Sequence, residues 1–114
     1  MKLLRVWSGL ALLGIASLAA AHVHLKQSVP AEGATVSAAP TQIVLTFNEP
    51  ALLTALWIQQ DANPKQKLGP VPTEAESTIT VPTPGLKAGK YVVTWRAVAP
   101  DRHVMSGALH FTVS

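Results

Sequence analysis

The sequence has 114 residues and a formal net charge of +3, and it contains no cysteine. This length fits one domain at most, and the lack of cysteine excludes a disulfide framework and a thiolate metal site. The first 21 residues hold two of the nine basic residues, so the rest of the chain is nearly neutral. No basic patch remains that would indicate binding to nucleic acid.

Residues 1–21 have the layout of a secretory signal peptide. Lys2 and Arg5 give a positive start, an apolar stretch covers residues 6–18, and alanines end the segment at residues 19–21. This order predicts cleavage after Ala21, which leaves a mature domain over residues 22–114. An uncleaved N-terminal anchor is the alternative, although the apolar stretch is shorter than the roughly 20 residues that span a bilayer.

The mature chain shows strand patterns and no long helical pattern. The predicted strands cover residues 24–28, 42–47, 55–59, 77–81, 91–98 and 108–113. The three most regular ones have inward rows at Ile43, Leu45 and Phe47, at Tyr91, Val93, Trp95 and Ala97, and at Leu109, Phe111 and Val113. Trp57 and Trp95 are predicted to be core residues, because large aromatic side chains on strands dominate the cores of β-sandwiches.

Turn residues separate these segments. Pro30-Ala31-Glu32-Gly33 predicts a type I turn, and further prolines and glycines interrupt residues 64–72 and 82–89. Many short strands divided in this way predict an all-β fold. We expect a Greek-key β-sandwich or barrel of the immunoglobulin-like kind, with about seven strands.

His22 becomes the first residue of the mature chain if cleavage follows Ala21. Its α-amino group then has an ordinary pKa of about 7.7–8, so a metal displaces the proton at little cost. The amine and the Nδ1 atom of the same imidazole can chelate one ion together. Cu(II) prefers nitrogen and oxygen ligands in a tetragonal arrangement, so this pair predicts a Cu(II) site.

Asp101 and His103 supply the remaining two groups of a four-coordinate site. In an extended segment, residues two apart point to the same side, so these side chains are expected to face one ion while Arg102 points away. His24 is either an additional ligand or a surface residue. His110 is expected to be a lone surface histidine.

The mature chain resembles the CopC family of periplasmic copper-binding proteins. The resemblance runs from residue 22 to the C-terminus and depends on an ordered set of segments. They are His22-Val23-His24-Leu25, Ser28-Val29-Pro30-Ala31-Glu32-Gly33, residues 43–50 (IVLTFNEP), residues 86–98 (LKAGKYVVTWRAV), Asp101-Arg102-His103 and residues 106–113 (SGALHFTV).

The resemblance implies one Cu(II) ion bound by His22, with its amine, and by Asp101 and His103. A glutamate after the early Phe strand supports the ligands in some members; Glu49 matches it, with a solvated loop carboxylate as the alternative. Members with a separate Cu(I) site are rich in methionine, whereas only Met105 remains here after cleavage, so no separate Cu(I) site is expected. Arg102 and Val104 stand where the family often has glycine and proline.

These features predict a binding protein and not an enzyme. We expect a monomeric periplasmic Cu(II) chaperone or buffer in copper resistance and homeostasis. The resemblance further implies a CopD-like transporter of the inner membrane as its partner. Two alternatives stay open: an oxidative enzyme that uses an N-terminal histidine to hold copper, and a metal-free structural sandwich.

Overall fold

The computed structural model describes residues 22–114, so the predicted signal peptide and its cleavage site lie outside the described residues. Seven strands and no helix are found in the described part, which confirms the all-β prediction. Their bounds are β1 Leu25–Val29, β2 Ala34–Val36, β3 Gln42–Gln60, β4 Gln66–Lys67, β5 Glu76–Pro82, β6 Gly89–Val98 and β7 Val104–Val113. Within residues 22–114 there is accordingly no helix that could cross a membrane.

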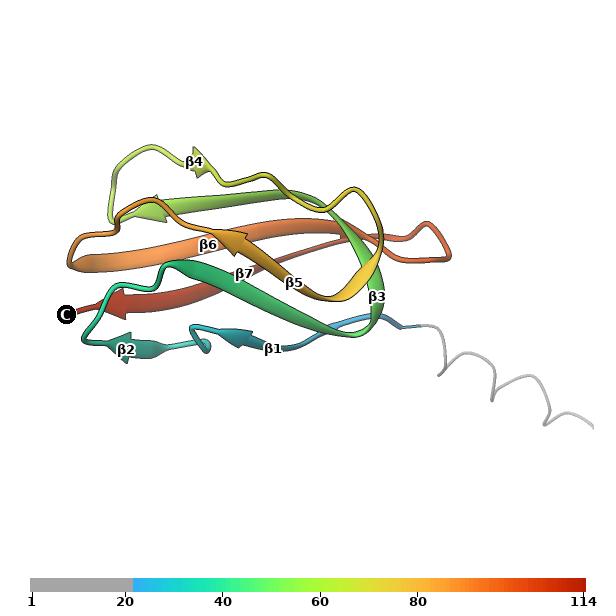
Figure 1. Cartoon of the computed structure of the whole chain (residues 1–114), viewed down its shortest axis with the longest axis horizontal. Coiled ribbons are helices and arrows are strands. Elements are labelled where there is room, and N and C mark those ends of the chain that lie inside the picture. The colour runs from blue at the N-terminus through green and yellow to red at the C-terminus, as the bar shows by residue number, and fades with distance from the viewer. Residues whose placement is uncertain (1–21) are drawn as a thin grey trace, which may run out of the picture.

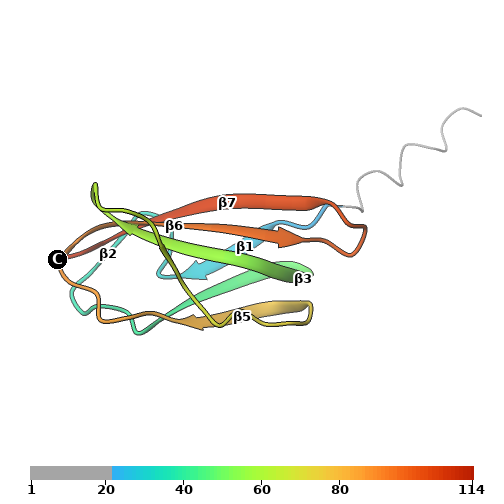
Figure 2. The same cartoon turned by 90° about the horizontal axis from the view of Figure 1, so that it is seen from above.

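The long strand β3 belongs to both layers of the sandwich. Its first half pairs with β1 and β5, and its second half pairs with β6 and β4. Strand β7 continues the second layer beside β6, and β2 joins β7 in parallel at the edge. Figures 1 and 2 show β3 bending at one end of the molecule and passing from one layer to the other.

The prediction of two separate strands at residues 42–47 and 55–59 was therefore wrong. The pairing of β3 is irregular between Thr46 and Ala51 and again between Leu53 and Ala55. Such irregularities bend a strand without ending it, and they accommodate Pro50, which cannot donate a ladder hydrogen bond. One continuous strand can thus serve both sheets.

The second irregularity in β3 also changes which residues face the core. Before it, Leu45, Phe47 and Leu53 are buried; after it, Leu56 and Ile58 are buried instead. One extra residue in a strand reverses the alternation of its faces. Trp57 is consequently half-buried on the outer face, with the Lys65 amine 5.2 Å from its ring centre, so the prediction of a core Trp57 was wrong.

The other inward rows agree with the prediction. Every predicted inward residue of β6 and β7 is buried, and so are Ile43, Leu45 and Phe47. Trp95 packs edge-on against Phe47, with 5.2 Å between ring centres, which joins the two layers. The Tyr91 hydroxyl donates to the carbonyl of Lys87 at 2.6 Å, a contact that resembles the tyrosine corner of immunoglobulin-like Greek-key sandwiches.

The turn after β1 lies one residue later than predicted. The backbone N–H of Ala34 donates to the carbonyl of Ala31 at 3.0 Å, so the turn covers residues 31–34. Gly33 occupies its third position with a φ of 77°. A positive φ at this position is typical of a type II turn and favours glycine, so the type I prediction was wrong.

Candidate metal centre

Three separate parts of the chain meet at one end of the sandwich. The segment before β1, the bend of β3 and the loop between β6 and β7 lie together there in both views (Figures 1 and 2). The first of these carries His22, the second carries Asn48, and the third carries Asp101 and His103. The fold therefore gathers the predicted site residues at one open end of the molecule.

The loop between β6 and β7 is a tight turn and not the extended segment that we expected. The backbone N–H of Arg102 donates to the carbonyl of Ala99 at 2.8 Å, and the N–H of Ala99 donates to the carbonyl of His103 at 2.9 Å. Arg102 has a φ of 74°. This is the hairpin loop in which a turn is followed by a residue in the left-handed conformation.

The turn brings Asp101 and His103 into direct contact. The Nδ1 atom of His103 lies 2.8 Å from Oδ2 of Asp101, and the His103 backbone N–H donates to Oδ1 at 3.1 Å. Both side chains are open to solvent, with exposed fractions of 80% for His103 and 44% for Asp101. These two hydrogen bonds hold the pKa of the Asp101 carboxyl below its ordinary value, and the bond with the His103 side chain has the larger effect.

We expect Arg102→Gly to stabilise the fold by about 0.5–1 kcal/mol. A non-glycine residue in the left-handed region costs about 1–2 kcal/mol, and the greater freedom of glycine in the unfolded chain offsets part of the gain. Urea unfolding of both proteins measures the difference. Lys87→Gly is the control, because Lys87 is also an exposed loop cation but has no positive φ. This control change should be slightly destabilising. Equal effects of the two changes on the free energy of unfolding would contradict the prediction.

The segment that carries His22 is held by Asn48. The Oδ1 atom of Asn48 accepts the backbone N–H of His24 at 2.7 Å, and its Nδ2 donates to the carbonyl of His22 at 3.0 Å. The backbone N–H of Asn48 donates to the carbonyl of His24 at 3.1 Å. Val23 packs against the core between these contacts, so the segment is fixed before β1 begins.

His22, Asp101 and His103 line one hollow of about 170 Å³ at this end. Its other lining residues are Val23, Ala99, Val104 and Met105. Within residues 22–114 no three His, Asp or Glu side chains are already arranged to hold one ion. The Asp101 carboxylate is turned onto His103, so metal binding by all three side chains needs a local rearrangement.

The two secondary candidates are not among the residues that line this hollow. His24 is exposed and is tied to Asn48 through its backbone. Glu49 is also exposed and forms no hydrogen bond or ion pair with another side chain among the described residues. Glu49 was predicted to be either a supporting group or a solvated carboxylate. Its neighbour Asn48 was not predicted, although an asparagine amide is suited to bind backbone groups in an Asx-type contact.

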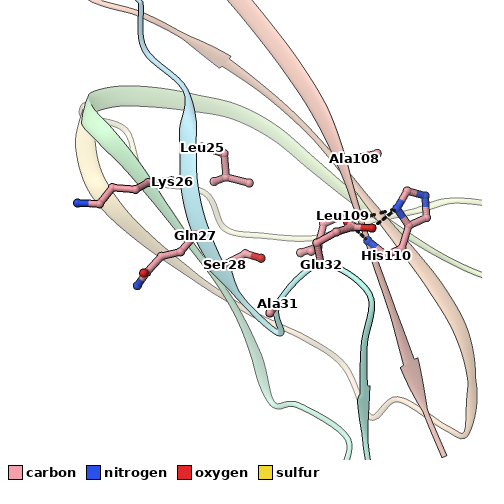
Figure 3. Close-up of a pocket in the computed structure, with 9 residues that line it drawn as sticks. All are labelled: Leu25, Lys26, Gln27, Ser28, Ala31, Glu32, Ala108, Leu109 and His110. Carbon is pink, nitrogen blue, oxygen red and sulfur yellow. Dashed lines mark hydrogen bonds and ion pairs between the residues drawn. The ribbon is translucent and has the colours of Figure 1, made fainter.

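His110 is exposed as expected, but it is not a lone histidine. Its Nδ1 lies 3.1 Å from Oε2 of Glu32, and its backbone N–H donates to Oε1 of Glu32 at 2.9 Å. Figure 3 shows Glu32 reaching His110 from the turn after β1, beside a larger hollow of about 650 Å³ between β1 and β7. This hollow contains one histidine and one carboxylate among its lining residues, which are too few ligands for a metal site.

The observations define a class of protein: a small Greek-key β-sandwich with a hollow at one end lined by two histidines and a carboxylate. The chain belongs to the CopC family, because the model of the CopC domain matches residues 25–114.

Curated relatives have similar lengths. The chain is 33% identical to copper resistance protein C of Pseudomonas syringae pv. tomato, over 87% of this chain and 86% of the relative. It is 34% identical to copper resistance protein C of Escherichia coli, over 95% and 94% of the two chains.

Solved structures agree with the fold. PcoC of Escherichia coli, described as a methionine-rich copper resistance protein, superposes with a TM-score of 0.61 at 35% identity and covers 82% of this chain and 100% of its own. CopC of Methylosinus trichosporium OB3b superposes with a TM-score of 0.71 at 23% identity, covering 82% of this chain and 94% of its own, and supports the fold alone. The prediction of an immunoglobulin-like Greek-key fold of the CopC kind is confirmed.

Proposed function

We propose that this chain is a periplasmic Cu(II)-binding protein that acts in copper resistance and homeostasis as a chaperone or buffer. The observation that carries the proposal is the single hollow lined by His22, Asp101 and His103, which come from opposite ends of the chain. The names of the curated relatives, which are copper resistance proteins, support copper as the metal.

The donor set of the hollow suits one Cu(II) ion. After cleavage at residue 21, His22 offers its amine and its imidazole, and the loop offers one imidazole and one carboxylate. Three nitrogens and one oxygen match the tetragonal preference of Cu(II), which is also the most tightly bound of the common divalent ions.

The contact between Asp101 and His103 prepares the loop for this role. When Nδ1 of His103 carries the proton, it donates to the Asp101 carboxylate and leaves Nε2 free as a ligand. Such carboxylate contacts orient metal-binding histidines and strengthen them as donors. Nε2 points away from this carboxylate, so Asp101 can join the same ion only after the local rearrangement that breaks its contact with Nδ1.

The openness of the site fits a protein that accepts and releases its metal. His103 is 80% exposed, so a second protein can approach the ion directly.

The proposed partner is a CopD-like transporter of the inner membrane. The proposed location is the periplasm, which the chain reaches through its signal peptide, and there the protein acts as a monomer. The proposed role is binding and transfer, without a catalysed reaction.

Copper titration of the processed protein tests the proposal. The mature N-terminus is first verified by mass spectrometry, and Cu(II) is then added in competition with a chromophoric chelator. We expect one tightly bound Cu(II) and an electron paramagnetic resonance spectrum with nitrogen coupling. A lack of tight binding would contradict the proposal, and sustained oxygen-dependent turnover with a reductant would favour an enzyme instead.

We expect Asn48→Ala to weaken Cu(II) binding about tenfold. The change removes two side-chain hydrogen bonds to the segment that carries His22, and their combined net worth of about 1–2 kcal/mol is then no longer available to position the ligand. Asn63→Ala is the control, because Asn63 is an exposed loop asparagine that accepts a hydrogen bond through its backbone carbonyl. Unchanged affinity in Asn48→Ala would show that the segment needs no such support.

A further inference from the structure

Met105 lines the hollow of the candidate metal centre. Met105 is the second residue of β7, pairs with the buried Ala97 of β6, and packs partly against the core. It also lines the same hollow as His22, Asp101 and His103. Since the chain has no cysteine and its other methionine is Met1, Met105 holds the only sulfur atom of residues 22–114.

The hollow thus combines three kinds of ligand: a carboxylate, a thioether and two imidazoles. A carboxylate is a hard ligand that favours Cu(II), whereas a thioether is a soft ligand that favours Cu(I). Imidazole binds both oxidation states of copper well. A site that has all three can keep its two imidazoles in both states. The carboxylate then binds Cu(II), and the thioether takes its place when the metal is Cu(I).

A structural role for Met105 is the competing explanation. Methionine often fills irregular gaps at the edge of a core because its side chain is flexible. Leucine has a similar volume and would fill the same gap, so packing alone does not require a sulfur atom. The two explanations differ in what they predict for a change from methionine to leucine.

We propose that Met105 lets the candidate metal centre hold Cu(I) as well as Cu(II). The inference rests on the proposed function, because it places Cu(I) at the same hollow. His22 and His103 bind the ion in both states, Asp101 serves Cu(II), and the thioether of Met105 serves Cu(I). A separate methionine-rich site is impossible in residues 22–114 with one sulfur, in contrast to the relative described as methionine-rich.

The variant Met105→Leu tests this inference in the processed protein. Cu(I) is supplied without oxygen as its acetonitrile complex, and its affinity is measured by competition with bicinchoninate. We expect Met105→Leu to bind Cu(I) at least about tenfold more weakly, with unchanged Cu(II) affinity and an unchanged Cu(II) resonance spectrum. The reduction potential of the bound copper should fall by about 59 mV for each tenfold loss of Cu(I) affinity.

Val104→Leu is the matched control, because it changes apolar bulk at the same hollow and leaves the sulfur in place. It should alter neither affinity. X-ray absorption of the Cu(I)-loaded wild-type protein gives a second measurement that needs no variant, and it should show a copper–sulfur distance.

The inference would be overturned by equal Cu(I) affinities in wild type and Met105→Leu, by equal losses of Cu(I) and Cu(II) affinity in the variant, or by a lack of sulfur scattering in the Cu(I) form. A wild-type protein that binds Cu(II) but not Cu(I) would also overturn it while the proposed function stands. Failure to bind either ion would instead be a failure of the proposed function.

Discussion

Replacing His103 with alanine is expected to lower the Cu(II) affinity of the processed protein at least ~100-fold. Changes to groups that only support a ligand typically cost about 10–100-fold, and the proposal makes His103 a direct ligand. The change also removes the one hydrogen bond between the ring of His103 and the Asp101 carboxylate, so this contact no longer positions Asp101. Competition titration with a chromophoric chelator measures the loss.

His110→Ala is a closely matched control for this experiment. His110 is also an exposed histidine whose Nδ1 contacts a carboxylate, here Glu32 at 3.1 Å. It lines a different hollow from that of His22. We expect its replacement to leave Cu(II) affinity unchanged. Equal effects of the two substitutions would show that copper binds exposed histidines without a defined site.

Adding one alanine before His22 is expected to lower Cu(II) affinity at least about 100-fold. Two donors carried on one residue bind far more tightly than separate donors, typically by a factor of about 10²–10⁴, because the second binding step is intramolecular. The added residue turns the amine of His22 into a peptide nitrogen and removes this chelate. Affinity and the Cu(II) resonance spectrum are compared after mass spectrometry has verified both N-termini.

The pH dependence gives an independent check of the same variant. In the wild-type protein, protons compete with the metal for the amine, whose ordinary pKa is about 7.7–8, and for the imidazoles. Affinity should therefore fall as the pH falls from 8 to 5, and more steeply than in the extended variant between pH 8 and 7. Identical pH profiles in the two proteins would show that the terminal amine is not a ligand.

The regular strands of this protein were predictable from local pattern alone. The alternating apolar residues of β6 and β7 and of the first part of β3 identify their buried faces, because side chains on a strand alternate with a period of two. The same rule failed at Trp57. The irregularity between Leu53 and Ala55 reverses the alternation, and its position depends on how β3 pairs with its neighbours.

Residue type and spacing, which are local properties, were enough to predict the all-β class, the buried rows and the candidate residues His22, Asp101 and His103. The folded chain was needed to show that His22 lies beside a loop from the other end of the sequence. The fold was also needed to show that Asn48 holds the first segment and that Met105 lines the same hollow. These contacts follow from the bend of β3 and the ends of β1 and β7, which bring together residues that are distant in the chain and that no local pattern relates.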